Sequence, residues 1–297
     1  MNPISSILQE VFFGKHFFIV AKILRDSLLI NSILLNSEIW YNLTKSNIDD
    51  LEKLDNILLR KILEVSSSVP TVFLHLELGT LPIRFILQTR RLMFLQYILQ
   101  EEETCLLHKF LISQIENPLA GDWWLSTIED MKDLEINLTL HEIKVMTKNV
   151  FKAKVNKAAS HLAFKWLSEE KLKLKKIKGI KHEKLEMQLY LSDPLVPIQT
   201  SKFLFHLRAR MLFVRANFRH MYKDEICQLC CQLPGQQSVD TQEHLLSCSK
   251  LNIDTEVGKV GLDYENIFSS NLENQARITL LLESKFEKRK KLESEEK

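Results

Sequence analysis

Four residues towards the end of the sequence are spaced like the ligands of one metal ion, and this spacing restricts the local fold more than any other feature. Two residues separate Cys227 from Cys230, three separate His244 from Cys248, and thirteen lie between the two pairs. Each short spacing lets two side chains converge on one ion, so the pattern predicts a tetrahedral Cys3His zinc site. Because the protein fills all four positions, we expect a structural zinc; a catalytic zinc keeps one position for water.

Two alternatives accompany this interpretation. Cys231 stands beside Cys230 and is the other candidate partner of Cys227; we prefer Cys230 because a two-residue gap is the commoner geometry at such sites. The second alternative is that these cysteines are small buried apolar side chains, a frequent role of free cysteine. The polar, turn-rich character of the segment favours the metal, and the chain has only one other cysteine, Cys105.

The segment before the first cysteine has the apolar periodicity of an amphipathic helix, running from Phe203 to Phe218. Beside the apolar stripe, Arg208, Arg215 and Arg219 share one flank at spacings of seven and four residues. A guanidinium group suits phosphate, so these three residues, the arginine ridge, are predicted to contact a nucleic-acid backbone. An ordinary solvated helix flank is the alternative.

A second basic stretch is expected in a helix over residues 150–176. Its phosphate-facing candidates are Lys171, Lys173, Lys175 and Lys176. A solvated helix face is again the alternative, since runs of charge usually have that role. The whole chain carries a net charge of only +2, so any attraction to polyanions must be local.

The cysteine pattern favours a reducing, intracellular compartment, because four of the five cysteines cluster with one histidine and the number is odd. Basic residues between 285 and 291 resemble a nuclear localisation patch, with a solvated helix end as the alternative. Charges interrupt the apolar N-terminal stretch, so we expect neither a membrane span nor a signal peptide.

Composition predicts an all-α fold. Glycine and proline number only seven each in 297 residues, and apolar residues recur at three- and four-residue spacing almost throughout. We expect multi-helix bundles with a small C-terminal Cys3His zinc knuckle. The expected units are a helical domain over 1–120, a helical connector over 121–199, a basic helix plus zinc knuckle over 200–250, and a polar loop with a charged C-terminal helix over 251–297.

Catalytic motifs are absent from the sequence. It contains no GxxxxGK[ST], GxGxxG, GxSxG or HExxH pattern. The only adjacent aspartates, Asp49 and Asp50, fall at the expected start of a helix, where acids favour the helix dipole. A pair that held two magnesium ions in a polymerase would instead stand in a hairpin between strands. We therefore expect a protein that is not an enzyme and has no small-molecule substrate.

Several segments carry a family resemblance. They are residues 14–18, Leu34–Tyr41, Leu51–Asp55, Leu76–Arg84, Arg90–Leu92, and Thr241–Cys248, which closes the cysteine motif. Together they resemble the C-terminal part of the non-LTR (LINE-type) retrotransposon reverse transcriptase polyprotein. The resemblance extends to about residue 250, and it is most specific at Gly79–Arg84 and in the final His/Cys segment.

This resemblance implies a helical thumb over residues 1–120 and a connector that ends in a zinc knuckle. The family's reaction is RNA-templated DNA synthesis primed at a nicked target. The sequence lacks the palm, its Tyr-x-Asp-Asp motif, the fingers and the endonuclease, so the polymerase activity is not expected, and the likeness implies a truncated copy or a separate frame derived from the element's tail. The predicted function is a non-catalytic, zinc-stabilised module that binds RNA or DNA, with a retroelement protein as a further partner. The alternative is a helical scaffold or an inactive relic.

Overall fold

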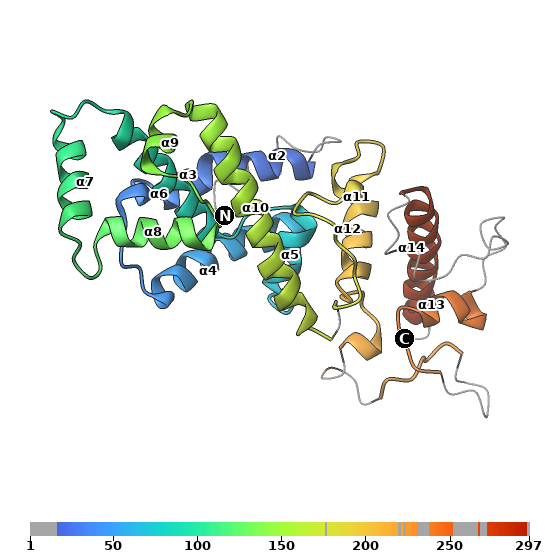
Figure 1. Cartoon of the computed structure of the whole chain (residues 1–297). Coiled ribbons are helices and arrows are strands. Elements are labelled where there is room, and N and C mark those ends of the chain that lie inside the picture. The colour runs from blue at the N-terminus through green and yellow to red at the C-terminus, as the bar shows by residue number, and fades with distance from the viewer. Residues whose placement is uncertain are drawn as a thin grey trace.

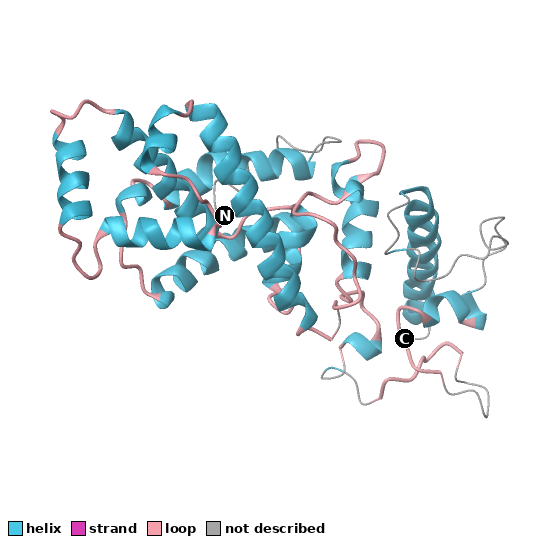
Figure 2. Ribbon diagram, in the orientation of Figure 1, coloured by secondary structure: helices cyan, strands magenta, loops and turns pink. Residues whose placement is uncertain are grey.

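The computed structural model describes residues 17–175, 177–218, 221, 224–230, 238–251, 267 and 272–295. Within these ranges the chain is helical, with two isolated β-bridges, Leu78 to Met187 and Ile226 to Val239, and no strand (Figures 1 and 2). The predicted all-α class is confirmed.

The first half of the chain forms a compact group of helices. They are α2 (Phe17–Leu24), the π-helical turn η1 (Arg25–Leu29), α3 (Ile30–Ile33), the 3-10 turn η2 (Ser37–Ile39), α4 (Lys45–Leu63), α5 (Thr71–Leu78), α6 (Ile83–Gln100), α7 (Leu106–Glu116) and α8 (Trp123–Asp133). Thr44 begins α4 with a capping box, since its side chain accepts from the Asn47 backbone while the Asn47 side chain accepts from the Thr44 backbone.

The second half adds one long helix and several short ones before the C-terminal helix. They are α9 (Leu140–Val145), α10 (Lys148–Leu172), α11 (Leu189–Ser192), α12 (Ile198–Arg208), the 3-10 turn η3 (Arg215–Asn217), α13 (His244–Ser247), the 3-10 turn η5 (Ser249–Leu251) and α14 (Leu272–Glu295). Figure 1 shows α12, α13 and α14 on one side of the molecule and α6 to α9 on the other.

The turn between α5 and α6 requires a glycine. Gly79 has a φ of +60°, and a Cβ at this position would lie 2.2 Å from the backbone carbon of Glu186. Real Cβ atoms do not approach backbone so closely, and side chains are strained at this φ. Pro82 then precedes α6, whose first turn needs no donor from it.

Two main hydrophobic cores organise these helices. One joins α6, α8 and α10 through side chains such as Leu95, Trp123 and Phe151. Because this core uses residues from both sides of position 120, the expected boundary there falls inside one packed unit. The other core joins α4, α5 and α12 to the cysteine segment and α14, for example through Phe205 and Leu282. The cysteine segment therefore packs on the helical body.

The helix before the cysteines is shorter than predicted. α12 ends at Arg208, and Arg210 adopts a left-handed φ of 57°, so one helix from Phe203 to Phe218 is wrong. The side-chain amide of Gln242 supplies the reason. Its oxygen accepts from the Leu212 backbone (3.1 Å) and its nitrogen donates to the Leu207 carbonyl (2.9 Å), which satisfies groups that a continuing helix would pair.

Among the helices that the structure describes, none is long and apolar enough to cross a membrane.

Candidate metal centre

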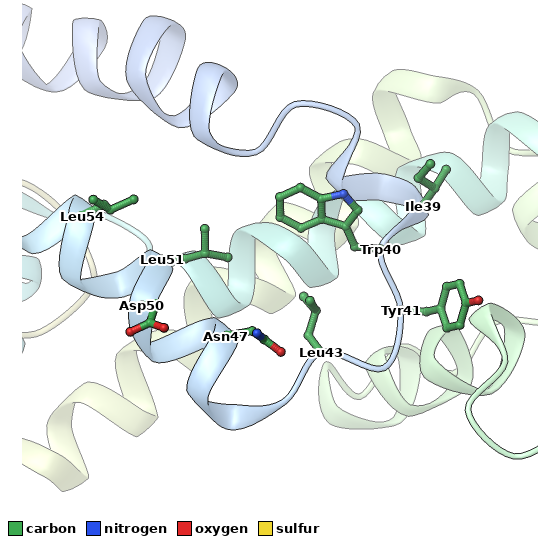
Figure 3. A pocket seen from close by; sticks show the side chains of 8 residues that line it. All are labelled: Ile39, Trp40, Tyr41, Leu43, Asn47, Asp50, Leu51 and Leu54. Carbon is green, nitrogen blue, oxygen red and sulfur yellow. The ribbon is translucent and has the colours of Figure 1, made fainter.

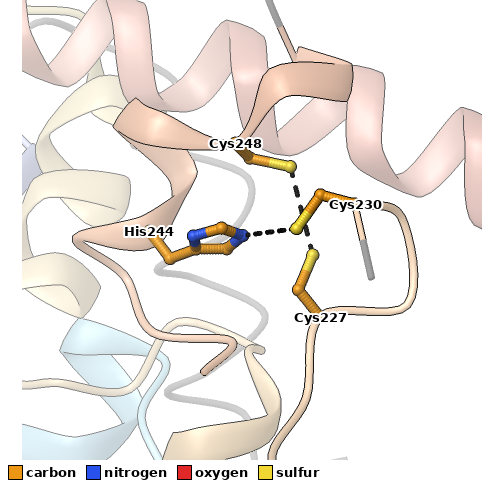
Figure 4. Close-up of side chains that lie close together, drawn as sticks. All are labelled: Cys227, Cys230, His244 and Cys248. Atoms are coloured by element: carbon orange, nitrogen blue, oxygen red, sulfur yellow. Dashed lines mark hydrogen bonds between the residues drawn. The ribbon is translucent and has the colours of Figure 1, made fainter. Parts of the chain in front are cut away.

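The four predicted ligands come together in the folded chain. Cys227, Cys230, His244 and Cys248 each offer a ligand atom, all of these atoms lie within 4.8 Å of one another, and the three cysteines are buried (Figure 4). Cys230 Sγ is 3.3 Å from His244 Nε2, and Cys227 Sγ is 4.0 Å from Cys248 Sγ. Ligands about 2.0 to 2.3 Å from a tetrahedral zinc stand about 3.5 to 3.8 Å apart, so the group can hold a metal ion.

Two local elements position these ligands. A short antiparallel pairing, in which the Cys227 amide donates to the Ser238 carbonyl (3.0 Å) and the Asp240 amide to the Glu225 carbonyl (2.7 Å), presents the first cysteine pair. The short helix α13 presents the second pair, because a spacing of four residues puts His244 and Cys248 one turn apart. The alternative ligand Cys231 lies outside the described residues.

One of the thiols, Cys227, favours the deprotonated form that binds a metal. The hydrogen bond between the two side chains lowers the pKa of Cys227 to about 4 and raises the pKa of Cys248. Because a thiolate is the form that binds a metal, one of the pair is ready at neutral pH.

Residues around the ligands tie the centre to the helical body. Asp240, fully buried, accepts from the Arg289 guanidinium of α14 at 2.5 and 2.7 Å. Lys285, also on α14, donates to the Leu246 carbonyl (2.7 Å), and Gln242 bridges to α12 as described above. Sequence reasoning missed Asp240 and Gln242, although two polar residues just before a predicted ligand are a signal for supporting contacts.

These contacts also change the interpretation of the basic run between 285 and 291. Lys285 and Arg289 are buried against Leu246 and Asp240, which stand next to the candidate ligands. They are therefore not part of an accessible nuclear localisation patch. α14 continues to Glu295, so the run is inside a helix rather than at its end. Its other basic residues include Lys290, which pairs with Glu287 (2.7 Å) on the exposed side.

The arginine ridge does not exist as one surface. Arg208 is only 1% exposed, and its guanidinium donates to both oxygens of Glu77 (2.9 to 3.2 Å) and to the Ile267 carbonyl (3.0 Å). Burial alone would raise the pKa of Glu77. The charge of Arg208 outweighs this effect and holds that pKa at about 2. Arg215 sits beyond the helix and pairs with Asp224 (3.2 Å); Arg219 lies outside the described residues.

The lysine candidates that the structure describes also differ from one another in burial and in pairing. Lys171 is buried and donates to the Ile180 carbonyl (2.6 Å), so it is not a phosphate ligand. Lys173 pairs with Glu170 (2.5 Å), Lys175 is exposed, and Lys176 lies outside the described residues. The prediction is wrong for Arg208 and Lys171, whose side chains are buried and donate to acceptors inside the protein, Glu77 and the Ile180 carbonyl.

A second group has ligand-like distances but different chemistry. Glu52, Asp55 and His75 offer atoms within 4.8 Å of one another. Arg25 occupies both Asp55 oxygens, with 2.7 Å to one of them, and the Arg84 guanidinium stands 3.9 Å from Glu52. Two cations already neutralise the carboxylates, so we assign the group to a buried ion-pair network. Burial lowers the pKa of His75 to about 4, which keeps its ring neutral.

An apolar hollow of about 640 Å³ opens on the surface beside the start of α4 (Figure 3). Trp40, Tyr41 and Leu43 line it from the preceding loop, and Leu51 and Leu54 from the helix. Asn47 and Asp50 are its only polar lining residues in the described chain. Few polar groups converge there, so the hollow lacks the means to orient a small substrate.

No protein-family model, curated protein or solved structure matches the chain.

Proposed function

We propose that this protein is a non-catalytic nucleic-acid-binding module whose C-terminal segment is stabilised by one structural zinc ion. The observation that carries the zinc assignment is the convergence of three buried thiols and one imidazole in a single group. Three sulfur ligands and one nitrogen favour zinc over the hard cations, which prefer oxygen. The role is structural because Cys227, Cys230, His244 and Cys248 would supply all four ligands of a tetrahedral zinc and leave none to water.

Elemental analysis of the purified full chain tests this assignment. We expect close to one zinc per chain, lost when Cys227 and Cys230 are both changed to serine. Cys231→Ser and Cys105→Ser are the matched controls, and both should keep the metal. If Cys231→Ser alone released zinc, Cys231 would be the ligand in place of Cys230. Wild-type protein without zinc would end the proposal.

The nucleic-acid part of the proposal rests on α10. Between Lys148 and Ser168 this helix carries five lysines and no Asp or Glu. The five, Lys148, Lys152, Lys154, Lys157 and Lys165, are exposed, and none forms a salt bridge with a described residue. Such unpaired ammonium groups can neutralise phosphates. The resemblance to a retrotransposon reverse transcriptase is the second support, and it implies a nucleic-acid-binding role without polymerase activity.

Fluorescence anisotropy with labelled single-stranded RNA and with duplex DNA tests the binding. We expect affinity at low salt that falls steeply as salt rises, because each phosphate contact releases counterions. Absence of binding at low salt to both probes would remove this function. Templated extension of a primer by the purified chain would show instead that the module is an active polymerase.

A second candidate is a helical protein-interaction scaffold, favoured by the apolar hollow near Trp40. Ile39, Tyr41 and Leu54 are each about half exposed and line one hollow, and exposed apolar side chains gathered at one place can mark a protein-interaction site. Lack of nucleic-acid binding, together with self-association lost in Leu54→Glu, would favour the scaffold.

A further inference from the structure

A groove between α6 and the start of α10 combines an aromatic platform with basic side chains. Its volume is about 510 Å³, and its lining residues include Arg90, Phe94, Tyr97 and Gln100 from α6 and Lys148 and Lys152 from α10. α6 and α10 lie side by side in Figure 1 and pack through the core described above. We call it the Tyr97 groove.

The aromatic platform is rigid. Tyr97 is 51% exposed, and its ring stacks on Phe94 with an interplanar angle of 14° and centroids 6.0 Å apart. Phe94 is held in turn by the edge of Trp123 (5.8 Å), whose indole nitrogen donates to the Glu38 carbonyl (2.8 Å). A fixed aromatic ring with an open side can accept a second flat ring at little cost in side-chain entropy.

Basic side chains line the α10 side of this platform, while Glu101 interacts with the Tyr97 hydroxyl at its edge. Lys148 and Lys152 stand one turn apart on α10, both exposed and without a salt bridge to any described residue. Arg90 lies in the floor, where its guanidinium donates to the Leu34 carbonyl (2.6 Å) rather than to a carboxylate. Glu38 is the only acid among the groove's described lining residues. The charge of the groove therefore favours an anion.

The start of α10 adds backbone donors. This 25-residue helix has no acid in its first turn, and the side chain of Thr147 makes no capping hydrogen bond. Its first amides are therefore unsatisfied by the usual side-chain acceptor, and they carry the positive end of the helix dipole. Gln96 fixes this helix start beside α6, since its side-chain nitrogen donates to the Met146 carbonyl (2.9 Å).

We propose that the Tyr97 groove binds single-stranded nucleic acid, with one base stacked on Tyr97 and neighbouring phosphates on Lys148, Lys152 and the first turn of α10. This inference rests on the proposed nucleic-acid function and names its surface and its preferred form. An unpaired base has the open face that stacking on Tyr97 needs, whereas the bases of a duplex are already stacked on each other. Arg90 adds positive charge to the groove, and it orients neither the Tyr97 ring nor the stacked base.

Anisotropy titrations of the full, zinc-loaded chain test the proposal, using a labelled RNA strand of about twelve nucleotides and its duplex DNA counterpart. We expect tighter binding of the single strand. Tyr97→Ala should weaken it about tenfold or more, and Tyr97→Phe, which keeps the ring, should bind like wild type. Lys148→Gln with Lys152→Gln should lower the slope of log affinity against log salt by about 1.4.

Lys61→Gln with Lys132→Gln is the matched control, because both lysines are exposed on α4 and α8, away from the groove's lining residues. It should leave the affinity unchanged beyond a small long-range effect. Circular dichroism on each variant should match wild type, since Tyr97, Lys148 and Lys152 are all exposed.

The outcomes separate this inference from the proposed function. Wild-type binding that Tyr97→Ala and the lysine pair leave unchanged, or a preference for the duplex, overturns the groove while the nucleic-acid function stands. Binding of neither probe overturns both. Loss of affinity in Tyr97→Phe equal to that in Tyr97→Ala also overturns the groove, because stacking would then not be the contact that matters.

Discussion

The predicted metal ligands and the arginine ridge adjoin in the sequence, yet only the ligands come together in the folded chain as predicted. The four ligands all lie within 22 residues, and two short spacings bring them together through local geometry. Arg208 instead pairs with Glu77, which lies 131 residues earlier. The prediction of the ridge is wrong because the sequence of a helix flank does not show which distant carboxylate its arginines will pair with. A spacing motif carries its own partners, whereas a row of charges does not.

The largest expected effect comes from removing the metal. Chelation should unfold residues 224–230 and 238–251 and loosen α14, because Asp240 and Leu246 in this segment bind Arg289 and Lys285 of α14. Zinc contributes roughly 10 to 16 kcal/mol in comparable peptides. Hydrogen exchange should show lost protection there and in α14, with α6 and α10 unchanged. Loss of protection across α6 as well would mean that the metal supports the whole body.

The next largest effect should come from the buried ion pair between Arg208 and Glu77. Arg208→Met leaves the buried Glu77 carboxylate without its main counter-charge, and this should lower the free energy of unfolding by about 3 to 5 kcal/mol. Urea denaturation measures it. Adding Glu77→Gln should restore much of the loss, because the uncompensated charge is removed. If Arg208→Met were as stable as wild type, Arg208 would not be a buried partner of Glu77. The prediction that it belongs to an exposed arginine ridge would then be favoured again.

Acid should distinguish the body from the metal centre. His75 in α5 is buried and neutral with a pKa of about 4, below the ordinary 6.5, so the unfolded chain binds its proton first. Stability is therefore present above pH 6.5 and lost as the pH falls towards 4. The expected loss between pH 6.5 and 4.5 is about 2 kcal/mol.

His75→Gln provides the control for that titration, because glutamine can keep a hydrogen bond to Thr80 without taking up a proton in this range. Urea unfolding of both proteins at pH 7 and 4.5 should show a smaller decline in the variant. Equal declines would assign the acid sensitivity elsewhere, including to protonation of the metal ligands.

Much of the fold was accessible from the sequence because helices depend on local periodicity. The long helices that became α4, α6, α10 and α14 all carry it, and Pro82 marks the start of α6. The end of α12 was not accessible, because the Gln242 side chain that terminates it is 35 residues from Leu207. The ligands of the metal centre were predictable from spacing, but Arg289 was not, since nothing near it distinguishes it from its basic neighbours.

The smallest effect should come from Arg215, the ridge residue that stays near the surface. Its pair with Asp224 at 3.2 Å is partly solvated, so Arg215→Gln should change the free energy of unfolding by less than about 1 kcal/mol and leave zinc bound. Its effect on nucleic-acid affinity is the sharper measurement. If the Tyr97 groove is the binding surface, Arg215→Gln should weaken RNA binding less than Lys148→Gln with Lys152→Gln at the same salt concentration. The reverse order would locate the phosphate contacts beside the metal centre, as the sequence first suggested, and would show that a single surviving arginine there outweighs the exposed lysines of α10.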